Sequence, residues 1–212
     1  MDAMQAALGR YLLSHCESPD DVLRDLAVET EATAPDLHIT HYEGALLSMI
    51  TRITGARRVV GVGVFTGYSS LCIARAMPED GRLLALEINA EWAAIAERYW
   101  KRAGVDHKID LRVGPAADAL LALPEDDEVD FAFIDADKVN HRLYYEELLR
   151  RMRPGGLILL ADSLRGGRVL KDDCDAEDVV AVRELNEAVH ADDRVDSLIF
   201  PSGDGATMVR KR

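Results

Sequence analysis

A mostly parallel α/β fold is predicted from three features of the sequence. Beyond residue 55, short apolar segments alternate with helical segments. Several apolar segments run directly into glycine or a carboxylate, as at Gly63, Glu87 and Asp135. The last two apolar segments are joined by a short turn, which is typical of a β-hairpin. Apolar strands that alternate with helices form a parallel sheet covered on both faces, so we expect one domain with a helical segment at 1–55 and a sheet core at 56–212.

The first 55 residues are predicted to be helical. Ser18-Pro19-Asp20-Asp21 is a good helix start, with Ser18 as the cap, Pro19 in the first turn and carboxylates near the positive end of the helix. A second apolar stripe, Ala45–Ile53, ends at Gly55, which can adopt the left-handed conformation that terminates many helices.

The strands of the core are short apolar runs bounded by glycine or polar residues. They are expected at Arg58–Gly63, Arg82–Glu87, Ile109–Val113, Val129–Ile134, Leu157–Ala161, Asp196–Phe200 and Ala206–Arg210. Helices are expected between them, for example at Glu91–Ala103 and Tyr144–Met152. The hairpin spacing places an antiparallel last strand at or near the sheet edge, and the polar segment Gly166–Asp178 is expected to be a loop beside the functional site.

Composition and charge narrow the class of protein. The net charge of −13 disfavours nucleic acid and anionic membranes as partners. Cys16, Cys72 and Cys174 give neither a disulfide framework nor a zinc spacing, which is typical of a reducing compartment. The N-terminus lacks a signal-peptide pattern, and no apolar run reaches the ~18 residues that span a bilayer. We therefore expect a cytoplasmic protein with no membrane association.

The turn after the first strand is rich in glycine. Gly61–Ser69 has the spacing G-x-G-x-x-x-G, whereas the dinucleotide fingerprint G-x-G-x-x-G needs glycine where Thr66 stands. This spacing argues against an NAD-dependent dehydrogenase. Glu87 follows Gly67 by 20 residues and ends the second strand. A carboxylate there can accept hydrogen bonds from the hydroxyls of an adenosine ribose, and the alternative is a solvated acid at a strand end.

Several ordered motifs resemble the caffeoyl-CoA and catechol O-methyltransferase family. These motifs are Val62–Ser69, Phe133–Lys138, Arg153–Gly156 and Pro201–Gly205, and the resemblance extends over about 43–212. It implies a Rossmann-like fold, S-adenosylmethionine as methyl donor and the hydroxyl of a small catechol-like or aromatic molecule as acceptor. It also implies a homodimer, with the N-terminal helices at the interface or over the substrate pocket.

The resemblance implies a role for each residue of the methyl-donor site. Gly63 and Phe65 would line the methionine part, Ser69 would bind its carboxylate, Glu87 would hold the ribose, Gly114 and Ala116 would lie by the adenine, and Asp135 would lie near the sulfonium. An acidic strand end suits a positively charged donor.

The resemblance further implies a divalent ion, usually Mg²⁺, at the ends of two strands. Asp135 and Asp162 match two of its ligands, and oxygen-rich sites are what such hard cations prefer. Ser163 stands where the family has Asn, so the metal site would be weakened, vacant or rebuilt with water. Lys138 matches the general base of the family, and Asp135 would take part in the chemistry beside it. The alternatives are strand-end loop acids and a solvated lysine.

Other departures leave open questions. Gly61 stands where the family has Glu, which normally supports the methionine end of the cofactor. His141 could act as an acid–base group, but a surface helix position is favoured. Asp137 could help to hold the ion, but a cap of the following helix through its side chain is favoured. His38 and His41 could contact substrate or, less favourably, a metal, and a plain loop position is the default.

These departures motivate two alternatives besides the dehydrogenase. The first is a metal-independent methyltransferase in which Lys138 or His141 acts on another acceptor, including a tRNA hydroxyl. The second is a protein that binds S-adenosylmethionine without catalysis.

Overall fold

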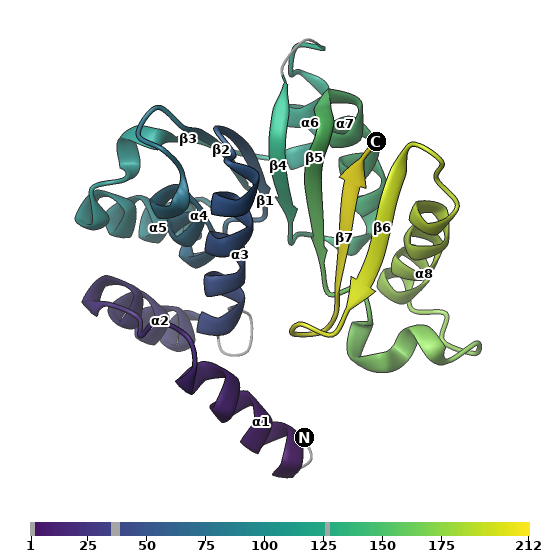
Figure 1. Cartoon of the computed structure of the whole chain (residues 1–212), viewed down its shortest axis with the longest axis horizontal. Helices are drawn as coiled ribbons and strands as arrows, with labels where there is room; N and C mark the ends of the chain where they lie inside the picture. Colours follow the sequence, from purple (N-terminus) through teal and green to yellow (C-terminus); the bar gives the residue numbers. More distant parts are fainter. Residues whose placement is uncertain (1–2, 35–38, 126–127) are drawn as a thin grey trace.

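The computed structural model describes the chain except for residues 1–2, 35–38 and 126–127 (Figure 1). Its sheet has seven strands in the order β3-β2-β1-β4-β5-β7-β6. The strands are β1 Arg58–Val62, β2 Arg82–Glu87, β3 Ile109–Val113, β4 Val129–Ile134, β5 Met152–Ala161, β6 Val195–Phe200 and β7 Ala206–Lys211. The pairs among β1 to β5 are parallel, and β7 is antiparallel to both β5 and β6. The predicted fold is therefore confirmed, with the last strand beside the edge strand β6.

The helices cover both faces of this sheet. They are α1 Ala3–Ser14, α2 Asp21–Thr33, α3 His41–Thr54, α4 Tyr68–Ala76, α5 Ala90–Ala103, α6 Ala116–Leu121, α7 His141–Arg151 and α8 Glu177–His190. Along β4, Phe131 and Phe133 pack with α2 to α5, while Ala132 and Ile134 pack with α6 to α8. Alternate side chains of a strand point to opposite faces, so one strand contributes to both apolar clusters. Because both faces of the sheet are covered by apolar packing, polar side chains lie at the ends of the strands. None of the helices described is long and apolar enough to cross a membrane.

Three predicted elements begin at least two residues away from their predicted starts, and one of them is α7, which begins at His141 rather than Tyr144. Helix α2 begins at Asp21, and its cap is Asp20, whose side chain accepts from the Leu23 amide at 3.0 Å. The prediction of Ser18 as the cap is wrong, because Asp20 lies one residue before the helix. Strand β5 begins at Met152 rather than Leu157, and the register between β4 and β5 is irregular at its start.

Helix α2 is fixed to the glycine-rich turn by a buried hydrogen bond. Thr30 Oγ1 lies 2.6 Å from Thr66 Oγ1, and it donates to the Leu26 carbonyl at 2.7 Å. Thr66 therefore donates to Thr30. Thr66, which stands where the dinucleotide fingerprint needs glycine, therefore connects the turn to α2.

We expect Thr30→Val to lower the free energy of unfolding by roughly 1–3 kcal/mol, because it leaves the Thr66 hydroxyl buried and unpaired. Urea titration measures this loss. Thr30→Ser keeps the hydroxyl and should retain most of the stability. Because valine keeps the methyl group of threonine, a Thr30→Val protein as stable as wild type would show that the hydrogen bond contributes nothing.

Candidate active site

The tips of β1 and β4 meet at the carboxyl edge of the sheet. The Gly63 amide donates to the Leu86 carbonyl at 3.0 Å, and the Asp135 amide donates to the Val62 carbonyl at 2.8 Å. Gly63 has φ +87°, and a Cβ at this position would lie 2.0 Å from the Asp135 carbonyl oxygen. Only glycine allows the backbones at the ends of β1 and β4 to pass this closely. The predicted ends of β1, β2 and β4 are therefore adjacent in the structure.

Glu87 shapes the glycine-rich turn from the end of β2. One carboxylate oxygen accepts from the amides of Val64 and Phe65 at 2.9 and 2.6 Å, and the other accepts from Asn89 at 2.9 Å. The residue is only 4% exposed, so the alternative of a solvated acid is wrong. Gly114 joins the same edge, because its amide donates to the Glu87 carbonyl at 2.8 Å.

The remaining residues predicted to bind the methyl donor surround this turn. Phe65 has φ +52° and meets the ring of Trp92 edge-on, with 4.7 Å between the ring centroids. Ser69 is buried in the first turn of α4, where backbone amides lack partners within the helix. Ala116 begins α6 just beyond the end of β3.

A cluster of opposite charges lies at the ends of β4 and β5. Lys138 Nζ is 3.0 Å from Asp162 Oδ2 and 3.4 Å from Asp135 Oδ1, and it lies 3.4 Å from the Ala161 carbonyl oxygen. Lys138 is only 8% exposed, which contradicts the alternative of a solvated lysine. Burial raises the pKa of Asp135, and the Lys138 ammonium offsets part of this effect. The structure thus brings together the three residues that were predicted to carry the chemistry.

Ser163 points away from this cluster. Its hydroxyl donates to the Leu160 carbonyl at 3.2 Å and accepts from Thr207 at 2.7 Å, and the residue is 2% exposed. Among the residues described, no group of three or more His, Cys, Asp or Glu side chains is arranged to hold a metal ion. A divalent ion prefers six or more oxygen ligands, whereas Asp135 and Asp162 here surround an ammonium. The residues present do not fit a divalent ion in this arrangement.

The structure adds two residues that the sequence did not single out. Arg165 Nη1 lies 3.6 Å from Asp162 Oδ2, so a second cation approaches the same carboxylate. Ser202 is buried, and its hydroxyl has no hydrogen-bond partner in the part of the chain that the structure describes. Ser202 lies within the Pro201–Gly205 motif, but the resemblance gave this motif no role at the site and the sequence does not show that the side chain is buried.

Ser202 lines a narrow slot beside the two carboxylates. The slot has a volume of about 40 Å³, and its walls are largely apolar side chains of α3, β4 and β5. It is lined by Ile39, Glu43, Leu46, Leu47, Phe133, Asp135, Leu159, Ala161, Asp162, Ser202, Gly205 and Ala206. The volume is far below the roughly 300–1,000 Å³ of most ligand pockets, so the slot admits only the edge of a small molecule.

Comparison with known proteins identifies the family. The family model described as "O-methyltransferase" matches residues 14–212. This chain belongs to the O-methyltransferase family. "Caffeoyl-CoA O-methyltransferase 2" of Zea mays is 44% identical over 179 residues, which cover 80% of this chain and 68% of the maize protein. "Probable caffeoyl-CoA O-methyltransferase 2" of Dictyostelium discoideum is 36% identical over 207 residues, which cover 95% of this chain and 90% of that protein.

A solved structure supports the methyl donor. The O-methyltransferase TomG of Streptomyces achromogenes, described as involved in tomaymycin synthesis and in complex with S-adenosylmethionine, matches with a TM-score of 0.90 and 30% identity. The match covers 100% of this chain and 99% of that one. The protein is therefore an S-adenosylmethionine-dependent O-methyltransferase, and not the dehydrogenase or non-catalytic binding protein that the sequence left open.

Three polar side chains of this O-methyltransferase have structural partners. His41 Nδ1 lies 2.8 Å from the Tyr68 hydroxyl, and Nε2 lies 2.6 Å from the Glu17 carbonyl oxygen, so both ring nitrogens are engaged. His38 lies outside the described residues. Asp137 accepts from the Tyr144 hydroxyl at 2.7 Å and makes no backbone cap, so the predicted cap is wrong.

His141 is the third of these side chains, and it is buried rather than on the surface. It is 1% exposed, and Nε2 lies 3.2 Å from the Ala136 carbonyl oxygen. The prediction of a surface histidine is wrong, because the first turn of α7 faces the core beside Lys138. Burial, together with the charge of Lys138, lowers the pKa of His141 to about 3.

We expect His141 to make the O-methyltransferase less stable in acid. The folded state keeps the ring neutral, while the unfolded state protonates below its ordinary pKa of about 6.5. Stability is therefore full above this value and falls as pH decreases toward 3, by at most about 1.4 kcal/mol per pH unit. Urea unfolding of wild type and His141→Gln at about pH 7, 6 and 5 isolates this loss from that of the carboxylates. Parallel stability curves would contradict it.

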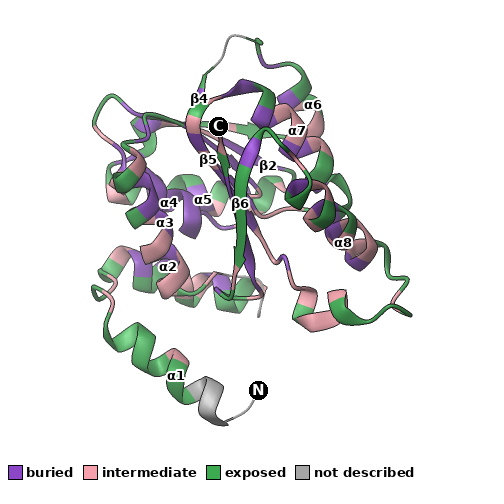
Figure 2. Ribbon diagram, turned by 45° about the vertical axis from the view of Figure 1, so that its right-hand side comes forward, coloured by how far each residue is buried: buried purple, intermediate pink, exposed green. Residues whose placement is uncertain are grey.

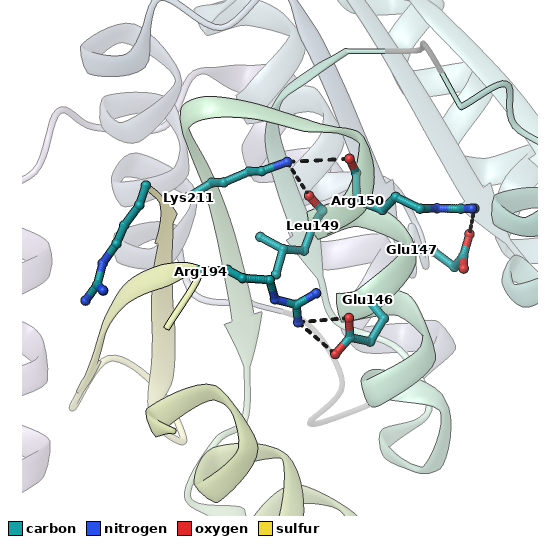
Figure 3. A pocket seen from close by; sticks show the side chains of 7 residues that line it. Glu146, Glu147, Leu149, Arg150, Arg194 and Lys211 are labelled. Carbon is teal, nitrogen blue, oxygen red and sulfur yellow. Dashed lines mark hydrogen bonds and ion pairs between the residues drawn. The ribbon is translucent and has the colours of Figure 1, made fainter. Parts of the chain in front are cut away.

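A surface depression larger than this slot lies elsewhere, at the opposite end of the strands (Figure 3). It has a volume of about 560 Å³ and is lined by Glu146, Glu147, Leu149, Arg150, Arg194, Lys211 and Arg212. Lys211 donates to the carbonyls of Leu149 and Met152 at 3.0 and 2.7 Å, where α7 ends and β5 begins. Arg194 pairs with Glu146 at 3.0 Å. The charged side chains of this depression are paired with groups of the protein itself. Their role is therefore structural, and Lys211 connects β7 to the end of α7.

Proposed function

We propose that this O-methyltransferase methylates a hydroxyl of a small catechol-like or aromatic molecule. The observation that carries the proposal is the convergence of Asp135, Lys138 and Asp162 next to the glycine-rich turn and to a slot with apolar walls. An aromatic edge fits the apolar walls, and its hydroxyl fits the polar cluster. The names of the maize and Dictyostelium relatives, which are caffeoyl-CoA O-methyltransferases, agree with an acceptor of this kind.

The methyl donor would lie across the tips of β1, β2 and β4. Gly63 and Phe65 would border its methionine part, and Ser69 would meet its carboxylate at the start of α4, where free amides favour an anion. Glu87 has lone pairs beyond those used by the turn, so it can also accept from the ribose hydroxyls. Gly114 and Ala116 would border the adenine.

Methyl transfer requires no covalent bond between the protein and either reactant. When bound, S-adenosylmethionine supplies a methyl group whose bond to sulfur breaks as the acceptor oxygen bonds to its carbon, and the electron pair stays on the sulfur of S-adenosylhomocysteine. The chain has to align the acceptor oxygen with that bond, and such positioning can supply much of the rate enhancement. The slot and the charge cluster would perform this alignment.

The acceptor hydroxyl must also lose its proton. Asp135, Lys138 and Asp162 lie within hydrogen-bond or ion-pair distance of one another, so the proton passes to the cluster rather than to one isolated group. The raised pKa of Asp135 makes its carboxylate a stronger proton acceptor than an exposed Asp. Lys138, the general base implied by the family resemblance, would have to lose a proton before it could accept one, because an ammonium has donors and no acceptor.

A screen of catechols and simple phenols with labelled S-adenosylmethionine, with and without Mg²⁺, tests the proposal. We expect label to appear in an aromatic methyl ether with at least one catechol. Calorimetry with S-adenosylhomocysteine shows whether the donor site is intact. Binding of this product without methylation of any catechol or phenol would contradict the proposed acceptor class.

We also propose that the protein is a cytoplasmic homodimer. Helix α1 extends from the body of the molecule and exposes Leu8, Tyr11, Leu12 and Leu13 (Figure 2). Clustered apolar side chains of this kind mark protein interfaces in many soluble proteins. The unpaired thiols of the three cysteines agree with a reducing compartment.

We expect Leu12→Glu to convert the dimer into a monomer, because it places a charge in the proposed interface. Light scattering coupled to size exclusion measures the mass. Leu170→Glu alters another exposed leucine, outside α1, and should leave the dimer intact. A wild-type protein of monomeric mass at micromolar concentration would contradict this arrangement.

A further inference from the structure

We propose that two cations of this chain, Lys138 and Arg165, take the position of a divalent ion, so that the enzyme holds the acceptor oxygen without a metal. This inference rests on the proposed function, because it assigns the group that meets the acceptor's oxygen. Three independent observations lead to it: the position of the ammonium, the second cation on Asp162, and the direction of the Ser163 hydroxyl.

The Lys138 ammonium lies where the two carboxylates converge. Its nitrogen is within 3.4 Å of oxygens from Asp135, Asp162 and the Ala161 carbonyl. An ammonium has three protons to donate and no acceptor, so all three contacts suit its charged form. A hard divalent cation would need the same oxygens, and it would meet a positive charge already in place.

Arg165 brings a second positive charge to the same carboxylate oxygen. Its Nη1 is 3.6 Å from Asp162 Oδ2, and its Nε and Nη2 contact Asp178 at 3.0 and 2.5 Å. Asp178 lies in the first turn of α8 and so fixes the guanidinium in place. The backbone is strained to allow this, with φ +58° at Asp162 and +47° at Arg165. Such strain persists only where surrounding contacts enforce it, and it is concentrated at functional sites.

The third expected metal ligand is turned into the sheet. The Ser163 hydroxyl is engaged by Leu160 and Thr207, and the Ser163 carbonyl accepts from Asn186 at 2.9 Å. Redirecting the hydroxyl toward Asp162 would leave Thr207 without its partner at 2.7 Å in the buried network. At the strand end, the Asp135 and Asp162 carboxylates therefore meet the Lys138 ammonium, and Arg165 approaches Asp162 while it also pairs with Asp178. As the acceptor oxygen becomes negative during methyl transfer, these cations would stabilise it in the way that a metal does elsewhere.

Titration of the full chain with Mn²⁺, followed by the EPR signal of the free ion, tests this inference without an activity assay. At ~1 mM free Mn²⁺, we expect wild type to bind fewer than about 0.1 ion per chain. A carboxylate site that suited a hard cation would often be occupied at this concentration. Lys138→Met combined with Arg165→Met frees both carboxylates, and we expect it to bind Mn²⁺ at least ~10-fold more tightly than wild type.

Lys101→Met combined with Arg52→Met is the matched control, because these residues lie in the last turns of α5 and α3. Both residues are exposed, and the double change alters the net charge by the same amount away from the site. It should leave Mn²⁺ binding as weak as in wild type. Equal gains in the two double variants would assign the effect to net charge and overturn the inference.

Two other results would also overturn it. One is stoichiometric Mn²⁺ binding by wild type that Asp162→Asn abolishes. The other is a Lys138→Met/Arg165→Met variant that retains the wild-type circular dichroism and still binds no Mn²⁺. If this variant does not fold, the wild-type titration and its Asp162→Asn comparison decide the matter alone.

The acceptor screen separates this inference from the proposed function. Methylation that survives dialysis against EDTA supports both. Methylation that requires Mg²⁺ would overturn the inference and leave the proposed function standing. Failure to methylate any catechol or phenol would contradict the proposed function, whatever the Mn²⁺ titration shows.

Discussion

Lys138→Met is expected to lower kcat/KM for methyl transfer by about 10²- to 10⁴-fold, the range typical of a group that handles a proton or a developing charge. The ammonium is the central group of the cluster, within 3.4 Å of both carboxylates. Without it, Asp135 and Asp162 repel each other and the acceptor's developing negative charge. Initial rates with a catechol acceptor and labelled S-adenosylmethionine measure the loss.

The expected defect is confined to chemistry. Calorimetry with S-adenosylhomocysteine should give an affinity close to that of wild type, because the predicted donor contacts come from other residues. Lys101→Met removes an exposed lysine of α5 and should retain full activity. A Lys138→Met enzyme with a wild-type rate would show that the cluster takes no part in the reaction.

Gly63→Ala is expected to weaken S-adenosylhomocysteine binding by about 100-fold or more, which corresponds to roughly 3 kcal/mol. The new Cβ would lie 2.0 Å from the Asp135 carbonyl oxygen, so the tips of β1 and β4 must separate. Both tips border the proposed donor site. Calorimetry measures the affinity, and urea unfolding reports how much of the loss reflects general destabilisation.

Gly104→Ala separates steric contact from backbone strain. Gly104 also has a positive φ, of +70°, but a Cβ there would meet no atom within 4 Å. This variant should lose only about 1 kcal/mol of stability and should keep its affinity for S-adenosylhomocysteine. Similar binding in Gly63→Ala and Gly104→Ala would refute the close approach of the two strand tips as the basis of the site.

The positions of the strands along the chain were largely predictable from local pattern. Strands β2 and β3 begin and end at the predicted residues, because apolar runs there are bounded by polar or turn residues. The start of β5 was missed, since Pro154-Gly155-Gly156 interrupts its apolar pattern even though the chain stays extended. The convergence of the strand ends followed from the parallel sheet, in which the ends of neighbouring strands share one edge.

The finer features of the site depend on tertiary contacts that a sequence does not display. His141 was assigned to the surface because helical periodicity alone did not show which side of α7 packs against the sheet. Arg165 reaches Asp162 only through a left-handed backbone, which is uncommon for residues other than glycine. The Ser163 hydroxyl was expected near the carboxylates, and its direction is decided by Thr207, which lies 44 positions later in the chain.

The contact between Thr30 and Thr66 constrains how chimeras of this enzyme can be built. A domain exchange that takes the N-terminal helices from one relative and the remainder from another would place new residues opposite each other at this contact. An apolar residue facing a hydroxyl there would leave a polar atom stranded next to the loop that cradles the methyl donor. Recombination should therefore transfer the two positions as a unit, or begin beyond residue 66.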